Sequence, residues 1–212
     1  MRGRVTWRRN RADGVARSAR RTFCWVPTWN AKRPHEGLEH LLVSDRNADG
    51  LVLAFDEEGR AFRLSYRLAW DESWCLREAD LAVTSTAGDH ALQLRADGQG
   101  CWKDGAGRAL RTLQGCLDID IWPSPFTNTF PIRRQPMTVG ERREIRTAWI
   151  RAPELQVQAQ SQAYTRLDAD RYRFEMLDGS GFSAVIDVDH EGVVLEYEGL
   201  FRRVLAPEDG LL

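Results

Sequence analysis

Apolar and polar residues alternate with a period of two along most of the chain, which is typical of β-strands with one buried and one solvated face. The clearest run is Phe62, Leu64, Tyr66, Leu68 and Trp70, whose intervening residues are polar or small. The same pattern predicts further half-buried antiparallel strands at 51–55, 171–176, 182–188 and 193–197.

Short clusters of Asp, Asn and Gly separate these runs and predict tight hairpins. They lie at 47–50, 56–59, 96–98, 168–170 and 189–192. No long stretch has the i, i+3, i+4 spacing of the helices that connect parallel strands. A sheet of more than about ten strands curls because strand twist accumulates. We therefore predict an all-β fold: one long antiparallel meandering sheet, with few helices, curled into a roll or half-barrel with a concave inner face.

The N-terminal part of the chain differs from the rest. Eight arginines stand against a single acidic residue, Asp13, in the first 28 residues, without sustained periodicity. We interpret residues 1–28 as a basic arm without predicted regular structure, 29–205 as one β domain and 206–212 as a short tail. Because no apolar run of about 7 to 15 residues follows the arginines, no secretory signal peptide is predicted, and we expect a cytoplasmic protein.

Composition narrows the function classes. Lys and Arg number 30 and Asp and Glu 31, so no net field draws the chain to nucleic acid or an anionic membrane. No window approaches the roughly 18 apolar residues of a membrane span. The four cysteines and four histidines show no metal-ligand spacing, and no cofactor is predicted. Phosphate-loop and esterase signatures are also missing from the sequence. These features favour a binding protein over an enzyme.

The stretch 115–134 is the most unusual. Asp118 and Asp120 share one face of a predicted strand, with Cα atoms about 6.6 Å apart. Inverting glycoside hydrolases use carboxyl groups roughly 6.5 to 9.5 Å apart, so hydrolysis of a glycoconjugate is one hypothesis. The structural alternative is that both aspartates pair with nearby arginines, such as Arg133 and Arg134, or face water.

Three prolines interrupt residues 122–132 and predict an irregular loop or edge segment, because proline cannot donate to a strand ladder. Thr127 and Asn128 place neutral hydrogen-bonding groups beside Trp122 and Phe126, which suits a hydroxyl-rich ligand held against an apolar surface. The structural alternative is a turn fixed by proline and capped by Asn128.

Five short motifs stand out along the chain. They are Gly37-Leu38-Glu39-His40, Gly115-Cys116-Leu117-Asp118-Ile119-Asp120, Pro125-Phe126-Thr127-Asn128-Thr129-Phe130-Pro131-Ile132-Arg133-Arg134, Tyr164-Thr165-Arg166-Leu167 and Gly199-Leu200-Phe201-Arg202-Arg203. Over about residues 29–204 these motifs resemble the bacterial Putative glycolipid-binding family. The central block 115–134 is specific, whereas the flanking motifs are short. This resemblance implies a spiral β-roll, a single long sheet wound on itself, which suits an amphipathic ligand; it transfers no catalytic residue.

The leading hypothesis is noncatalytic binding of an amphipathic small molecule, such as a glycolipid, in the concave face of the sheet. The alternatives are the hydrolase using Asp118 and Asp120, and nucleic-acid contact through the arginine-rich arm. Stable nucleic-acid binding is not expected, because no recognition module accompanies the arm. A lone strand histidine such as His40 is more often a hydrogen-bonded structural residue than a functional one. The candidate ligand-binding residues are His40, Asp118, Asp120, Trp122, Thr127, Asn128, Arg133, Arg134 and Tyr164.

Overall fold

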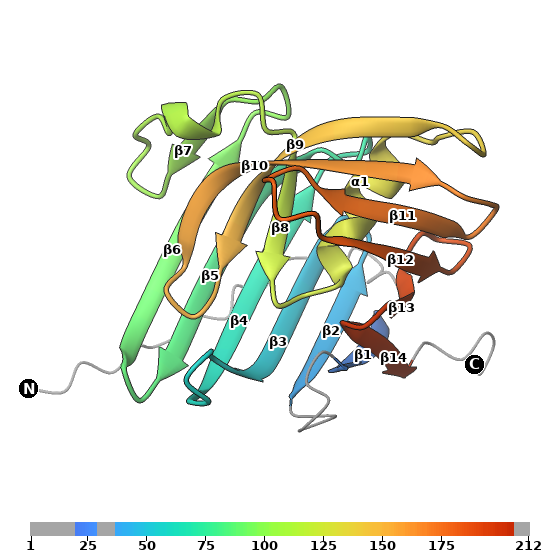
Figure 1. The fold of residues 1–212 in the computed structure, drawn as a ribbon. Helices are drawn as coiled ribbons and strands as arrows, with labels where there is room; N and C mark the ends of the chain where they lie inside the picture. The colour runs from blue at the N-terminus through green and yellow to red at the C-terminus, as the bar shows by residue number, and fades with distance from the viewer. Residues whose placement is uncertain (1–19, 29–36, 206–212) are drawn as a thin grey trace, which may run out of the picture.

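The computed structural model describes residues 20–28 and 37–205. Within them, fourteen strands form one sheet that is not closed into a barrel (Figure 1). The predicted all-β fold with little helix is thereby confirmed. The elements are β1 Arg21–Pro27, β2 Leu38–Ser44, β3 Asn47–Phe55, β4 Ala61–Trp70, β5 Leu76–Ser85, β6 Gly88–Ala96, β7 Trp102–Asp104, η1 Arg111–Leu113, β8 Asp118–Trp122, η2 Phe126–Asn128, α1 Thr129–Arg134, β9 Arg142–Arg151, β10 Gln156–Arg166, β11 Arg171–Met176, β12 Ser183–Val188, β13 Val194–Tyr197 and β14 Phe201–Leu205.

The strand order follows the chain, but the two edges of the sheet come from the middle of the sequence. β1 pairs with both β2 and β14, so the first and last described strands are neighbours inside the sheet. The edges are β7 and β8. All described pairs are antiparallel except β8 with β9, which is parallel. Parallel neighbours need a crossover of a dozen or more residues, and residues 123–141, containing η2 and α1, supply it.

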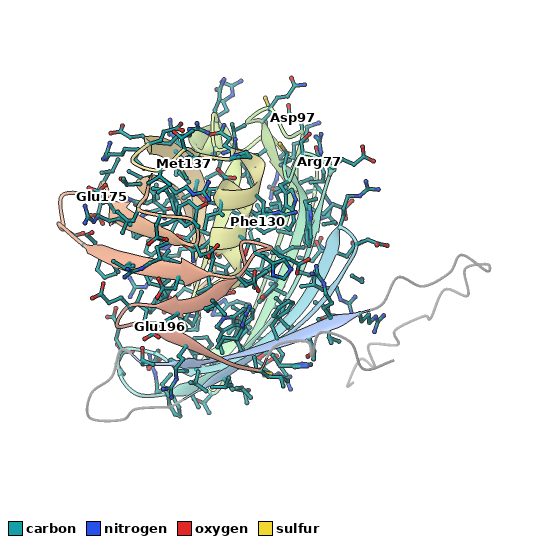
Figure 2. The ribbon with its side chains drawn as sticks, turned by 90° about the vertical axis from the view of Figure 1, so that its right-hand side faces the viewer. Arg77, Asp97, Phe130, Met137, Glu175 and Glu196 are labelled. Atoms are coloured by element: carbon teal, nitrogen blue, oxygen red, sulfur yellow. The ribbon has the colours of Figure 1, made fainter. Side chains whose placement is uncertain are left out.

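The sheet wraps around this crossover segment. In Figure 1 the strands β1–β6 form one layer, β10–β13 pass across it, and β8 and α1 lie between them. Figure 2 shows α1, with Phe130, between the two layers. Twist accumulates across a sheet this wide, so the sheet curls, and both of its halves bury their inner faces against one segment.

Two clusters of buried side chains fill the roll, and the crossover contributes to both. Phe126 and Phe130 pack into the larger cluster, together with inward-facing residues of β1–β6, β8 and β9. Ile132 belongs to the smaller cluster, built mainly from β10–β14, and Trp122 packs against it. Most of the concave space predicted from the sequence is therefore occupied by the chain's own side chains.

The predicted turn at 47–50 is wrong. These residues begin β3, whose positions alternate between exposed and buried along its whole length, and the turn lies at Asp45 and Arg46. Asp45 takes the positive φ of 45° that the tight turn requires. Gly50 is buried opposite Tyr66 of β4, so the glycine makes room for a ring rather than forming a hairpin.

The irregular loop predicted over 122–132 is also corrected, because this segment contains η2 and α1. Pro125 immediately precedes η2, and Pro131 lies in the first turn of α1. Proline is tolerated at these positions because the first N–H groups of a helix have no partner within it.

Part of the segment assigned to the basic arm belongs to the sheet. Residues 21–27 form β1, which pairs with a strand on each side. Its alternate residues Phe23 and Trp25 are buried in the larger cluster, which explains why this segment joins the sheet. The remainder of the predicted arm, residues 1–19, and the predicted tail, 206–212, lie outside the described residues, as do 29–36. No helix among the residues described is long and apolar enough to cross a membrane.

Three of the remaining predicted turns share one local feature. In the hairpins that start at Asp56, Asp97 and Asp189, the carboxylate accepts hydrogen bonds from the backbone N–H groups two and four residues later. Aspartate favours turns because its short side chain replaces missing backbone partners in this way. These short-range bonds explain why the sequence marks the turns correctly.

Gly50→Ala is expected to destabilise the fold by about 1 to 3 kcal/mol. A Cβ at this position would lie 2.1 Å from Cζ of Tyr66, a ring held on both sides by neighbouring strands. Urea denaturation measures the effect. Gly105→Ala is the matched control, because its added Cβ meets the flexible side chain of Gln93. Equal midpoints for the two variants would contradict the prediction.

Candidate functional site

A cavity of about 370 Å³ remains inside the roll, between the end of β8 and the C-terminal strands. Ligand pockets typically span about 300 to 1,000 Å³, so this one is in the lower part of that range. Its lining combines large apolar side chains with a few polar groups. The lining residues are Glu57, Asp120, Ile121, Trp122, Ser124, Asn128, Trp149, Arg151, Phe174, Met176, Phe182, Tyr197, Leu200 and Phe201.

Five rings form a continuous aromatic wall, which we define as Phe182, Phe174, Tyr197, Phe201 and Trp122. Each ring contacts the next, with centroid separations of 6.1, 5.9, 6.3 and 5.9 Å. The rings meet at angles of 59° to 64°, close to edge-to-face packing, which fixes aromatic side chains in position. The wall therefore presents a large, preformed apolar surface to the cavity.

Asp120, Ser124 and Asn128 form the polar floor of the pocket. Period-two geometry places Asp120 on the same face of β8 as Trp122, so a carboxylate and an indole point into one space. Ser124 follows the strand, and Asn128 ends η2. The floor thus comes from one short segment, residues 120–128, which joins the end of β8 to the start of the crossover, whereas most of the wall comes from distant strands.

Asp120 is half-buried and accepts hydrogen bonds from neutral groups. Gln162 Nε2 of β10 donates at 2.6 Å and Thr127 Oγ1 at 3.4 Å. Burial raises the pKa of Asp120, and these two hydrogen bonds oppose the rise. The charge of Asp120 adds to burial in raising the pKa of Tyr197, which places this phenol within electrostatic reach of the floor.

Asn128 is held by two hydrogen bonds. Its Oδ1 accepts from the buried hydroxyl of Tyr164 at 2.8 Å, and its Nδ2 donates to the carbonyl of Pro125 at 2.9 Å. Tyr164 therefore positions a residue of the floor without lining the cavity itself. The Asn128 side chain therefore both closes the turn after Pro125 and lines the cavity.

Behind the floor lies a fully buried acid, Glu39 of β2. Its Oε1 accepts hydrogen bonds from the hydroxyl of Tyr66 and from Ser124 Oγ, the latter at 2.7 Å, while Oε2 has no partner. Burial raises the pKa of Glu39 to about 7, against the effect of the two hydrogen bonds. Ser124 thus connects the pocket to a carboxyl group that exchanges a proton near neutral pH.

An ion pair lies at the rim of the pocket. Arg151 Nη2, at the end of β9, lies 2.7 Å from Glu57 Oε1 in the turn between β3 and β4. The pair connects the two layers of the roll at the mouth of the cavity. Both side chains are well exposed, so we assign the pair little stability.

The structure does not bring the other predicted site residues to this pocket. Asp118 is buried and forms two hydrogen bonds with Arg134, at 2.8 and 2.5 Å, as the structural alternative predicted. Arg133 is exposed, stacks over Trp74 at 5.1 Å and donates to the carbonyl of Glu191. Thr127 lies beneath the floor, where its hydroxyl accepts from the N–H of Ile121.

His40 lies on the outer, solvated face of β2, where its Nε2 is 3.0 Å from Thr22 Oγ1. It is a surface residue in this fold, in line with the structural expectation for a lone strand histidine.

The hydrolase hypothesis gains no support from this arrangement. Asp118 is 1% exposed and paired with Arg134, and it does not line the cavity that Asp120 lines. Two carboxyl groups must flank the same glycosidic bond in an inverting enzyme. In the described part of the chain, no group of His, Cys, Asp and Glu side chains is arranged to hold a metal ion. The four cysteines are free thiols.

Sequence reasoning missed Ser124, Glu39 and most of the aromatic wall. The alternating pattern predicts Phe174, Phe182 and Tyr197 on the buried face of the sheet. A one-dimensional pattern does not distinguish a core residue from one that lines a cavity. Glu39 did carry a signal, because it occupies the inward position of the alternating run that continues with Leu41 and Val43. A charged residue at a buried position is rare unless it is paired or functional.

The fold and the pocket together define a single-sheet β-roll protein with an amphipathic cavity between its two layers. The family model described as Putative glycolipid-binding matches residues 26–203, and the chain belongs to this family. It is also similar to the crystal structure of a DUF1089 family protein from Pseudomonas aeruginosa. That structure shares 47% identity with a TM-score of 0.79, over 93% of this chain and 100% of the other. The comparison with curated proteins gives no match.

Proposed function

We propose that this protein binds an amphipathic ligand of the glycolipid type, without transforming it, in the cavity between β8 and the C-terminal strands. The observation that carries this proposal is that the aromatic wall and the polar floor line one cavity. An apolar chain would lie against the rings, and a hydroxyl-bearing end would meet Asp120, Ser124 and Asn128. The family description supports the same class of ligand.

The size of the cavity limits what is enclosed. With roughly 30 Å³ per water-sized group, about a dozen such groups fill 370 Å³. This corresponds to a sugar ring or a short alkyl segment, rather than to a whole lipid with two chains. We therefore expect only the part of a long ligand nearest the junction between its polar and apolar regions to be enclosed.

Titration with octyl β-glucoside below its micelle concentration tests the proposal, with tryptophan fluorescence as the signal because Trp122 and Trp149 line the cavity. Phe182→Ala should weaken binding roughly five-fold, the equivalent of about 1 kcal/mol of lost apolar contact. Phe182 is 38% exposed, so its removal is expected to leave the fold intact.

Phe55→Ala is the matched control. Phe55 is 39% exposed but lies on the outer face of β3 and does not line the cavity. It should leave the glucoside affinity unchanged. Native mass spectrometry of protein purified from its own host provides an independent measurement. The proposal fails if only the empty mass is recovered and no alkyl probe changes the fluorescence or the melting temperature.

A further inference from the structure

Among the residues that the structure describes, the Asp120 carboxylate on the cavity floor has no cationic partner. Within residues 20–28 and 37–205, the groups that contact the Asp120 carboxylate are the amide of Gln162 and the hydroxyl of Thr127, both neutral. Gln162 is itself buried and extends from β10 to reach Asp120. A half-buried carboxylate held only by neutral donors retains its electrostatic field within the cavity.

The two arginines of α1 do not neutralise this charge. Arg134 is paired with Asp118, and Arg133 stacks on Trp74 at the surface. Arg151 is the cation among the cavity-lining residues, and it is paired with Glu57 at the rim. With Asp120 ionised, the titratable side chains that line the cavity carry one positive and two negative charges.

The floor of the cavity also presents mainly hydrogen-bond acceptors. Ser124 donates its hydrogen to Glu39 Oε1, so its hydroxyl presents a lone pair to the cavity. Asp120 is an acceptor when ionised, and Asn128 Nδ2 already donates to the carbonyl of Pro125 with one of its two hydrogens. The floor therefore offers more acceptors than donors.

We propose that the pocket selects ligands whose polar end donates hydrogen bonds and carries no negative charge, and that Asp120 excludes phosphate, sulfate and carboxylate head groups. The selected chemistry is a sugar hydroxyl or an amine. This inference rests on the proposed function and narrows it, because glycolipids include both neutral and anionic head groups. An anionic group at the floor would face Asp120 without a compensating cation, which is unfavourable in a partly desolvated site.

Three probes with the same octyl chain test the inference at pH 8: octyl β-glucoside, octylamine and octyl sulfate, each below its micelle concentration. We expect octyl sulfate to bind at least about 30-fold more weakly than octyl β-glucoside, and octylamine to bind at least as tightly as the glucoside. Isothermal titration calorimetry gives the three affinities. The comparison on the unmodified protein needs no substitution.

Asp120→Asn should reduce the discrimination between glucoside and sulfate by about ten-fold or more, through tighter binding of the sulfate. Asp187→Asn is the matched control, because Asp187 pairs with Arg171 outside the cavity. Equal affinity of the unmodified protein for glucoside and sulfate would overturn the inference while leaving the proposed function intact. If a folded Asp120→Asn variant still discriminates between the glucoside and the sulfate as the unmodified protein does, Asp120 is not the residue that excludes anionic head groups. If none of the three probes binds, the proposed function fails as well.

Discussion

Arg134→Met is expected to lower the free energy of unfolding by about 3 to 5 kcal/mol. The substitution leaves the Asp118 carboxylate in a space where it is 1% exposed, without the two hydrogen bonds that Arg134 now donates. Burial already raises the pKa of Asp118, and Arg134 opposes that rise. Removing the guanidinium therefore leaves a buried group that must either stay charged without a partner or take up a proton.

Arg133→Met is the control for Arg134→Met, because the two arginines are neighbours in α1. Arg133 is exposed and stacks over Trp74, so its loss should cost about 1 kcal/mol or less. Urea denaturation of both variants gives the two values, provided that the slopes agree with that of the unmodified protein. A double variant, Asp118→Leu with Arg134→Met, should recover part of the loss, because it removes both charges. Equal stability of the two single variants would refute the expectation.

Glu39→Gln is expected to change how stability depends on pH. The pKa of Glu39 is about 7 in the folded protein, above its ordinary value of 4.5 in an unfolded chain. Below pH 4.5 both states hold the proton. Between pH 4.5 and about 7 the unfolded chain releases it first, so the contribution of Glu39 to stability falls as the pH rises. The difference of about 2.5 pKa units corresponds to a loss of roughly 3 kcal/mol by pH 8.

The glutamine variant lacks this titration. Its stability relative to the unmodified protein should therefore rise by roughly 3 kcal/mol between pH 4 and pH 8, as measured by urea denaturation across the range. Glu196→Gln is the control for the change from glutamate to glutamine itself, since Glu196 is exposed on β13. A difference for Glu39→Gln that is flat with pH would show that this carboxyl group does not titrate near neutrality in the folded state.

The pH profile also bears on ligand binding, because Glu39 accepts the hydrogen bond of Ser124 at the floor of the pocket. Gly50, Tyr66, Glu39 and Ser124 form one chain of contacts from β3 to the cavity. We therefore expect a substitution at Gly50 or at Ser124 to disturb the buried groups between them, because these groups have little room to adjust. Binding assays on the Glu39 and Gly50 variants should accordingly be interpreted together with their stability.

Three of the fourteen residues that line the pocket could be predicted from the sequence. Asp120, Trp122 and Asn128 line the pocket, and Tyr164 positions Asn128, as parts of motifs that stand out for their composition. The aromatic wall could not be distinguished from ordinary core, because Phe174 and Tyr197 fit the inward face of a strand equally well in either case.

The sequence by itself determined several of the strands, most of the turns that it marked and the curled all-β architecture, because period-two alternation and aspartate turns act over a few residues. Only the tertiary structure decided that β1 lies between β2 and β14, and that the crossover enters the roll instead of covering its edge. The tertiary structure also decided which partners the two aspartates on one face of β8 meet. Asp118 meets Arg134, whereas Asp120 meets Gln162 from a strand 42 residues away. Whether a carboxylate inside the fold meets a cation or only neutral donors depends on such distant partners, and no local pattern specifies them.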